Sequence, residues 1–518
     1  MEKHILVQII ASLAVAVVVG LTLRLYSAVV ATPRRLRHVL KQQGVGGPPP
    51  AFLLGNIMEI KNSQVISAAA ATTGPPDSDN CGANCVASVF DEWRRQYGDI
   101  YTFSLGNKPV LVVNNYDVLK EVTKCISLDL GKPLYQAKDL EALLGNGILP
   151  SNGKLWAHQR KIIAPELFID KVKGMTNLIQ QSTMMLIDSW QGVIDAEGGI
   201  KADIKIDDYL KKFSGEVISR ACFGSSYAEG EQLFKKFAAL QQLTANKGVL
   251  LGIPAMRYVP TKQNRREWEV KRDVKELILK LVKQKSEENL EKNMLQMILQ
   301  GAESSNLSSD AVEKFIVDNC KNIYIAGFET TAITASWCLM LLASNPEWQH
   351  RLREEVLGVC NGQLPDFGSI KQMKQLAMVI NETLRLYPPA WVVSREALNE
   401  LEFNNIRIPK GVCIWMMVVS LHTDPEIWGA DSYQFKPERF ANGTIGACKH
   451  PNLYMPFGVG PRTCLGMNLA MVELKILVAL LLSNFSFSLS PNYVHAPALN
   501  VNVQPAHGVH LLIQRSHA

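Results

Sequence analysis

The sequence lacks a strong charge imbalance, because 54 Lys and Arg residues stand against 48 Asp and Glu residues, for a formal net charge of +6. This mild balance does not favour nucleic acid as a partner. The 10 cysteines also lack a regular framework. The only close pair, Cys81 and Cys85, has no further metal ligands nearby, which argues against a zinc site or a disulfide scaffold. Scattered cysteines are typical of a reducing compartment.

One long hydrophobic run stands at the N-terminus. Ile5 to Leu23 is apolar apart from Gln8, Ser12 and Thr22. At about 1.5 Å per residue this run nearly matches the roughly 30 Å hydrocarbon core of a bilayer, and it is longer than the apolar part of a signal peptide. Positive charge follows it, at Arg24, Arg34, Arg35, Arg37 and Lys41. The pattern predicts a membrane anchor over 1–30 with the rest of the chain on the cytoplasmic side.

The remaining chain is expected to form one large domain. A basic and Pro-rich linker is predicted over 31–50, and 65–89 is expected to be a flexible insertion within the domain at 51–518. Tyr101 to Val113 predicts two strands around a Gly106-Asn107 turn, and shorter strands are expected near 401–418 and 495–514. Residues 262–293 carry an apolar stripe of Val270, Val274, Leu277 and Leu281, typical of a surface helix. The fold class is therefore mainly α with small sheets.

The strongest local pattern is Phe457-Gly458-Val459-Gly460-Pro461-Arg462-Thr463-Cys464-Leu465-Gly466, which precedes an apolar helix from Met467. A thiolate at a helix start is favoured by the helix dipole and by amide donors. Gly460 and Gly466 leave room for a flat ring, and Arg462 supplies positive charge. Alone, Cys464 could be an ordinary buried cysteine.

This loop resembles the cysteine-ligand loop of the cytochrome P450 family. The resemblance implies a mainly α P450 fold with small sheets behind a transmembrane helix, and a haem whose iron is bound by Cys464, with Phe457, Gly460, Arg462 and Gly466 around it. An axial thiolate favours O–O cleavage. The family likeness extends from about Pro48 to the C-terminus and is closest to plant microsomal monooxygenases, which implies a single-pass protein of the endoplasmic reticulum membrane.

A long helix is predicted to start near Ser309 or Asp310 and to run to Asn345. Its centre reads Ala326-Gly327-Phe328-Glu329-Thr330-Thr331. The glycine and the threonine hydroxyls can bend or loosen the helix. This centre resembles the oxygen-activation motif of the family. The resemblance implies that Thr330 orients bound oxygen and its water, and that Glu329 relays protons. Viewed alone, the segment could be a tolerated irregularity.

Further motifs follow the family order. Trp156 and Arg160 share a helix face, and family position implies that they bind haem propionates, together with Arg395. Glu382 and Arg385 share another helix face. By resemblance they form a buried charge cluster with Arg439 that supports the cysteine loop.

The resemblance also places a substrate pocket above the haem. Its candidate lining residues are Phe328, Trp391, Val392 and Val509, and the segment 131–150 is a candidate lid. The run His158 to Pro165 resembles the hormone-oxidising clan of plant enzymes, with the gibberellin-oxidising branch as the nearest likeness. Each lining residue could instead be part of the core.

The chain has no Gly-rich nucleotide-binding fingerprint after a strand, so electrons must come from a partner. The resemblance implies an NADPH-dependent flavoprotein reductase. Lys436, Lys449 and Arg462 could receive this partner, or they could simply be solvated surface residues. The expected function is a monooxygenase that hydroxylates or epoxidises a small hydrophobic substrate, with a gibberellin-type diterpenoid or another plant hormone as candidate classes. Two alternatives stay open, a haem-thiolate isomerase or dehydratase and a non-catalytic haem-binding membrane protein.

Overall fold

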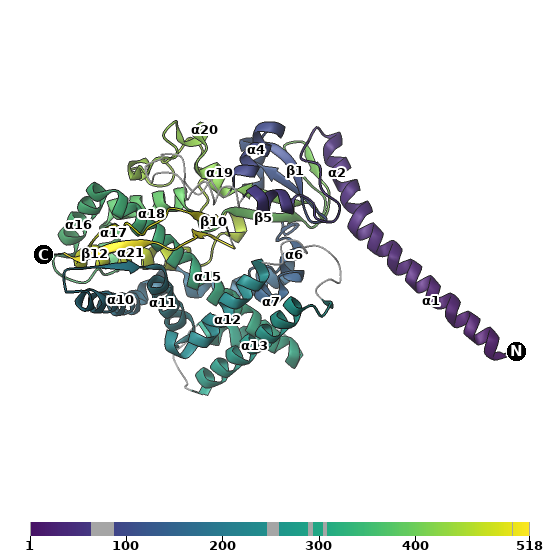
Figure 1. The fold of residues 1–518 in the computed structure, drawn as a ribbon, viewed down its shortest axis with the longest axis horizontal. Coiled ribbons are helices and arrows are strands. Elements are labelled where there is room, and N and C mark those ends of the chain that lie inside the picture. The colour runs from purple at the N-terminus through teal and green to yellow at the C-terminus, as the bar shows by residue number, and fades with distance from the viewer. Residues whose placement is uncertain are drawn as a thin grey trace.

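The structure is a computed structural model that describes residues 2–63, 87–245, 258–287, 294–303, 308–499 and 501–516. Cys81, Cys85 and most of the expected insertion at 65–89 lie outside these residues. The described chain forms a helical body with small sheets, from which one long helix projects (Figure 1). The predicted fold class is confirmed.

The projecting helix contains the N-terminal hydrophobic run. It comprises α1 (Glu2–Tyr26), a π-helical turn η1 (Ser27–Ala31) and α2 (Thr32–Gln42). Part of the expected linker at 31–50 is therefore helical, and Gly46 then contacts the body because its carbonyl oxygen accepts a hydrogen bond from Thr102 N at 2.8 Å. Among the described residues, three helices are long and apolar enough to cross a membrane, and only this one is unburied, with 0% of its apolar window inside the protein against 78% and 61% for the others.

The largest sheet stands near the base of the projecting helix. Its strands follow the order β1-β2-β8-β5-β3. The predicted hairpin is confirmed, since β1 and β2 pair antiparallel around Gly106, whose φ of 61° suits glycine. The strand bounds are β1 (Ile100–Leu105), β2 (Lys108–Val113), β3 (Leu130–Gly131), β5 (Val392–Ala397) and β8 (Cys413–Met417).

Three smaller sheets complete the β structure of the described chain. One has the order β4-β12-β9, and two are the hairpins β6-β7 and β10-β11. The predicted strands near 401–418 and 495–514 are thus confirmed. The bounds are β4 (Lys201–Lys205), β6 (Leu401–Phe403), β7 (Ile406–Ile408), β9 (Phe485–Leu489), β10 (Pro497–Leu499), β11 (Val503–Pro505) and β12 (His510–Arg515).

The helices of the body surround one long central helix, α15 (Ser309–Ser344), which ends before Pro346 because proline cannot continue its hydrogen-bond ladder. The predicted surface helix is confirmed as α13 (Lys262–Glu287), with Val270, Val274 and Leu281 buried and Leu277 partly buried against the core. The other α-helices are α4 (Ser88–Tyr97), α5 (Tyr116–Lys124), α6 (Leu134–Lys138), α7 (Glu141–Leu144), α8 (Gly153–Ile163), α9 (Ile169–Gly174), α10 (Thr176–Ala196), α11 (Asp207–Ile218), α12 (Tyr227–Ala245), α13 (Lys262–Glu287), α14 (Met294–Glu303), α16 (Pro346–Cys360), α17 (Phe367–Gln372), α18 (Lys374–Leu386), α19 (Val418–His422), α20 (Pro425–Trp428) and α21 (Met467–Asn484).

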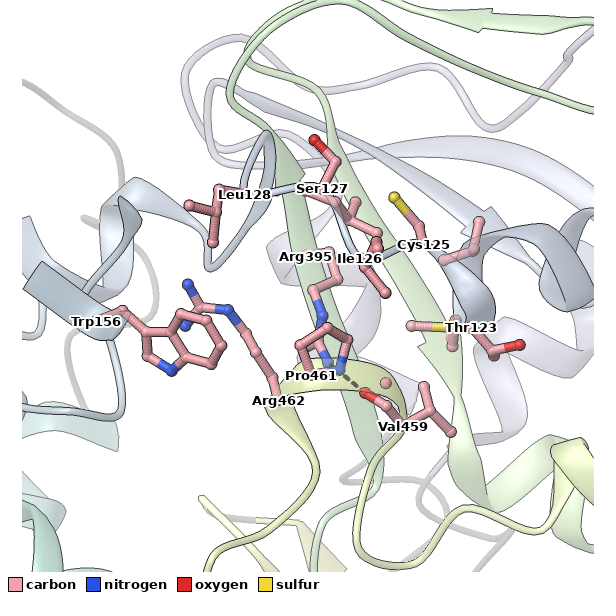
Figure 2. A pocket seen from close by; sticks show the side chains of 14 residues that line it. Thr123, Cys125, Ile126, Ser127, Leu128, Trp156, Arg395, Val459, Pro461 and Arg462 are labelled. Carbon is pink, nitrogen blue, oxygen red and sulfur yellow. Dashed lines mark hydrogen bonds between the residues drawn. The ribbon is translucent and has the colours of Figure 1, made fainter. Parts of the chain in front are cut away.

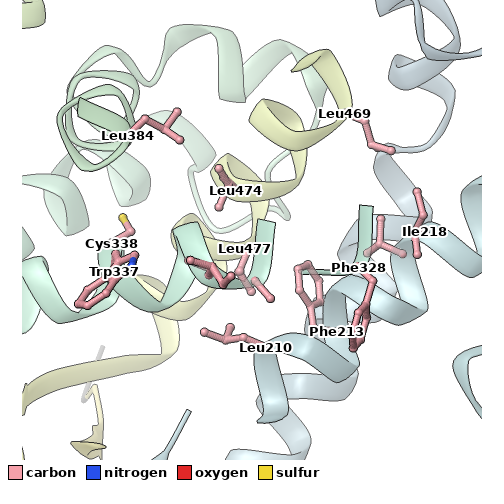
Figure 3. Close-up of a cluster of buried hydrophobic side chains, with 14 of the residues drawn as sticks. Leu210, Phe213, Ile218, Phe328, Trp337, Cys338, Leu384, Leu469, Leu474 and Leu477 are labelled. Carbon is pink, nitrogen blue, oxygen red and sulfur yellow. The ribbon is translucent and has the colours of Figure 1, made fainter. Parts of the chain in front are cut away.

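The core lies where α11, α15, α18 and α21 meet (Figure 3). Leucine and aromatic side chains from these four helices fill it, and α15 and α21 are apolar on nearly every side, as expected for helices inside a large domain. This packing fixes the centre of α15 relative to the start of α21. Labelled members of the cluster are Leu210, Phe213, Ile218, Phe328, Trp337, Cys338, Leu384, Leu469, Leu474 and Leu477.

Candidate haem-thiolate site

The cysteine loop is a tight turn that ends at Gly466, directly before α21. The Cys464 amide donates to the carbonyl oxygen of Phe457 at 2.8 Å, which closes the loop. Gly458 and Gly460 adopt φ angles of 72° and 67°, where only glycine is unstrained. A Cβ at Gly460 would also lie 3.0 Å from the carbonyl oxygen of Thr123. The loop conformation therefore depends on these glycines.

Cys464 combines an accessible sulfur with a position deep in the protein. Its side chain retains exposed surface, yet burial raises the pKa of its thiol. Both observations follow from a sulfur that borders a space inside the protein, where it is accessible but surrounded by protein atoms. The backbone N–H groups of Gly466 and Met467 and the guanidinium of Arg160 act against burial and lower the pKa. A Cβ at Gly466 would lie 4.0 Å from the Cys464 sulfur, an ordinary van der Waals distance.

Arginine and tryptophan side chains gather beside this loop in one pocket (Figure 2). Arg462 lies over the Trp156 ring at 4.3 Å and donates to the Ser151 carbonyl oxygen and to Asn152 Oδ1, both at 2.9 Å. Arg395 donates to the Val459 carbonyl oxygen at 3.3 Å. Arg462 thus points into the protein, toward Trp156 and Asn152.

The pocket concentrates positive charge. Arg160 extends from α8 and donates to the Thr463 carbonyl oxygen at 3.1 Å. Burial lowers the pKa of Arg395 to about 10, and burial together with Arg395 and Arg160 lowers the pKa of Arg462 to about 10. Lys132 joins them, because burial, Arg395 and Arg462 lower its pKa to about 7. No carboxylate of the described chain pairs with these cations, so the pocket suits an anionic ligand.

The centre of α15 carries an accessible strip within a buried helix. Ala326 is exposed, and Gly327, Glu329 and Thr330 are half-buried, whereas the helical turns on either side are buried. Thr330 Oγ1 donates to the Ala326 carbonyl oxygen at 2.8 Å, the back-bond expected from the sequence. The helix nevertheless continues without interruption. Glu329 accepts hydrogen bonds from Gln241 and Asn502.

The predicted charge cluster is assembled beneath the cysteine loop. Arg385 forms a bidentate pair with Glu382 at 2.7 Å, and both side chains are completely buried. Arg439 lies 3.6 Å from the Glu382 carboxylate. His422 joins the cluster, because Arg385 donates to its carbonyl oxygen and its ring Nε2 accepts from Met455 N at 2.9 Å, just before the cysteine loop.

The expected pocket-lining residues divide into core and edge positions. Phe328 packs against Phe234 at 4.6 Å, and Val509 is fully buried beside β4, so both belong to the core. Trp391 packs on Phe90 and Trp415, and Val392 is half-buried at the start of β5. None of these residues lines the pocket of Figure 2.

The expected lid over 131–150 is tied to α15. Asp318, Asn319 and Asn322 accept hydrogen bonds from the backbone N–H groups of Asn146, Ile148 and Leu149 at 2.8–3.1 Å. A Cβ at position 145 would clash with Asp318, which explains the glycine there. Movement of this segment must break these bonds.

Sequence reasoning missed Lys132, Asn152, Gln241 and Asn502. Each stands in a segment without a recognisable motif, and only long-range contacts bring it to the site. Lys132 reaches Arg395 because it immediately follows the short strand β3, which pairs with β5, the strand that carries Arg395.

Comparison with known proteins defines the class. The family model described as Cytochrome P450 matches residues 81–506, and the chain belongs to this family. It is 50% identical over 488 residues to Cytochrome P450 714C2 of Oryza sativa subsp. japonica, which covers 93% of each chain. It is 46% identical to Cytochrome P450 714B2 of the same plant, over 95% of this chain and 93% of the relative. Cytochrome P450 714A2 of Arabidopsis thaliana is 43% identical, over 93% and 94%.

Members of this family are monooxygenases that hold haem iron through a cysteine thiolate. The residues present fit such a group. Cys464 offers an accessible sulfur with amide donors, and the pocket of Figure 2 offers unpaired cations for the two carboxylates of a porphyrin. On α15, Ala326 and Thr330 have small side chains and remain accessible within an otherwise buried helix.

Proposed function

We propose that this monooxygenase binds haem through Cys464 and hydroxylates or epoxidises a gibberellin-type diterpenoid or another hydrophobic plant hormone. The observation that carries the proposal is the pairing of an accessible Cys464 sulfur with a cluster of unpaired cations beside it. A bound haem supplies the iron at which dioxygen is reduced and its O–O bond is cleaved.

The protein's own residues would hold this group. Cys464 binds the iron as the thiolate, with the Gly466 and Met467 amides favouring its charged form. Arg160, Arg395, Arg462 and the Trp156 indole bind the propionates. Lys132 adds a further amine, whose protonated form a nearby carboxylate would favour. Phe457, Gly460 and Gly466 shape the loop around the sulfur.

Proton handling falls to the strip on α15. The Thr330 hydroxyl donates to Ala326 O at 2.8 Å and can still accept a hydrogen bond from water through its free lone pair. Glu329 is half-buried and adjacent to Thr330 in sequence, so its carboxyl is accessible enough to exchange protons with solvent.

The substrate class rests on likeness. The run His158 to Pro165 on α8 and η3 (Ala164–Leu167) resembles the gibberellin-oxidising branch. The relatives named above are plant P450 proteins that match this chain almost from end to end. A hydrophobic acid of moderate size also suits an enzyme that meets its substrate at a membrane surface.

Electrons would come from an NADPH-dependent flavoprotein reductase in the endoplasmic reticulum membrane, to which α1 anchors the chain. Of the basic residues expected to receive that partner, Lys449 is exposed, Lys436 is paired with Asp431 at 2.9 Å, and Arg462 points inward. Lys449 is therefore the strongest candidate of the three.

The decisive experiment combines spectroscopy with product analysis. Reduced protein under carbon monoxide should show the far-red-shifted Soret band of thiolate ligation, and a Cys464→Ser variant should lose both the band and turnover. Reductase-containing microsomes are then incubated with diterpenoid acids, sterols and cytokinins, and a product mass increased by one oxygen is expected from the diterpenoids.

Other outcomes separate the alternatives. Product formation without NADPH and dioxygen would indicate an isomerase or dehydratase. A normal Soret band with no product from any compound would favour the non-catalytic alternative. A Cys464→Ser variant that retains turnover would overturn the proposed haem ligand.

A further inference from the structure

Two side-chain amide groups, neither of them part of a recognised motif, hold the Glu329 carboxylate. Gln241 Nε2 and Asn502 Nδ2 each donate to the same carboxylate oxygen, Oε2, at 2.8 Å. The donors lie 88 residues before and 173 residues after Glu329. Because an ionised carboxylate only accepts, both amides must present their nitrogen to it.

Each donor belongs to a separate element packed on α15. Gln241 is on α12, whose Phe234 packs on Phe328 at a ring distance of 4.6 Å. Asn502 immediately precedes β11. That turn is anchored at the next residue, since Val503 N donates to the Pro389 carbonyl oxygen at 3.0 Å and Trp337 Nε1 donates to Val503 O at 3.3 Å.

The hydrogen-bond geometry decides where the carboxyl exchanges protons. A carboxylate oxygen has two lone-pair directions, and both directions on Oε2 are taken by the amides. Proton transfer must then occur at Oε1. Among the residues that the structure describes, no cation forms an ion pair with Glu329, so neutral donors orient the carboxylate without cancelling its charge.

We propose that Gln241 and Asn502 are positioning residues for Glu329. They aim Oε1 into the site only while α12 and the turn before β11 are both seated against α15. Displacement of either element rotates the carboxyl away from the proton path. This inference rests on the proposed relay role of Glu329. The two amide contacts make the relay depend on the packing of α12 and of the turn before β11 against α15.

The test uses the full-length protein in reductase-containing microsomes. Gln241→Met and Asn502→Leu remove the donors at similar size, and Gln242→Met alters the exposed neighbour on α12 as a matched control. Hydrogen peroxide released per NADPH oxidised is measured without substrate and with each diterpenoid acid of the panel. Each donor variant should raise this ratio about fivefold, the effect of losing one hydrogen bond.

The same variants are combined with Glu329→Gln, which removes the exchangeable acid. If the two amides act through Glu329, replacing them in the Glu329→Gln background should cause no further increase in hydrogen peroxide per NADPH. Hydrogen exchange measured by mass spectrometry on the resting protein should also quicken over α12 in Gln241→Met and over 497–505 in Asn502→Leu, relative to Gln242→Met.

Two results would overturn the inference in distinguishable ways. In the first result, Glu329→Gln raises peroxide release, but the Gln241 and Asn502 variants either have no effect or increase it further in the Glu329→Gln background. The relay role of Glu329 is then supported, and the positioning role of the two amides is contradicted. If Glu329→Gln itself leaves the peroxide ratio unchanged, the relay role fails first and the positioning role fails with it.

Discussion

Glu382 and Arg385 lie one helical turn apart on α18 and form a bidentate ion pair at 2.7 Å with no exposed surface on either side chain. Glu382 also accepts from Lys436 N at 2.8 Å and faces Arg439 at 3.6 Å. The pair therefore connects α18 to the chain that leads into the cysteine loop, which gives a local helix motif a long-range structural role.

Removing the acid of this cluster should unfold the region beneath the loop. Glu382→Gln leaves the Arg385 guanidinium buried without a counter-charge, which costs about 3–5 kcal/mol of unfolding free energy. We expect little folded, haem-containing protein, measured as the carbon monoxide difference spectrum per unit of protein. Glu400→Gln breaks the exposed pair with Arg407 and is the control. Equal haem content in the two variants would contradict the supporting role of the cluster.

Gly460→Ala should destabilise the cysteine loop by more than the cost of placing alanine at a positive φ angle. The φ of 67° disfavours alanine by about 1–3 kcal/mol, and the new Cβ would meet the Thr123 carbonyl oxygen at 3.0 Å. Gly443→Ala is the matched control, with a φ of 73° and no atom within 4 Å of the added Cβ. We expect haem retention on gel filtration to fall only in Gly460→Ala. A similar loss in both would mean that backbone strain alone is responsible.

Thr330→Val replaces the hydroxyl of the α15 strip with a methyl group of the same size. Without a group that can bond water, reducing equivalents should leak to peroxide, and product per NADPH should fall by at least about tenfold. Thr334→Val removes the corresponding bond one turn later, from Thr334 Oγ1 to Thr330 O, and is the control. Full coupling in Thr330→Val would contradict the proton role assigned to this hydroxyl.

Glu473 on α21 makes stability depend on pH. Burial raises the pKa of its carboxyl from 4.5 to about 8, although the Ser214 hydroxyl opposes the shift. Between these values the folded state keeps a proton that the unfolded state has lost. Stability is therefore full below about pH 4.5 and decreases as the pH rises to about 8, in total on the order of 5 kcal/mol.

Glu473→Gln should abolish this dependence. The denaturation midpoint, followed by tryptophan fluorescence from pH 5 to pH 9, should decline less steeply in the variant than in the wild type. Glu347→Gln, at an exposed position on α16, should keep the wild-type slope. Parallel slopes for Glu473→Gln and wild type would show that Glu473 is not the titrating group.

Local patterns were sufficient for the elements that depend on neighbouring residues. The Gly106-Asn107 turn, the α13 stripe and the limits of α15 followed from turn chemistry, periodicity and proline. The roles of Phe328 and Val509 were less predictable, because an apolar side chain suits a pocket wall and a core equally well, and the structure places both in the core.

The amino-acid sequence by itself determined the membrane-length apolar helix, the cysteine loop before α21 and the order of the family motifs. Each of these features depends only on consecutive residues or on the order of short motifs along the chain. Only the tertiary structure decided which charges meet. It brings Lys132 to Arg395 and Arg462, turns Arg462 inward, and places Gln241 and Asn502 on one oxygen of Glu329. Such contacts join residues far apart in the chain, and the packing of whole helices and strands sets their distances.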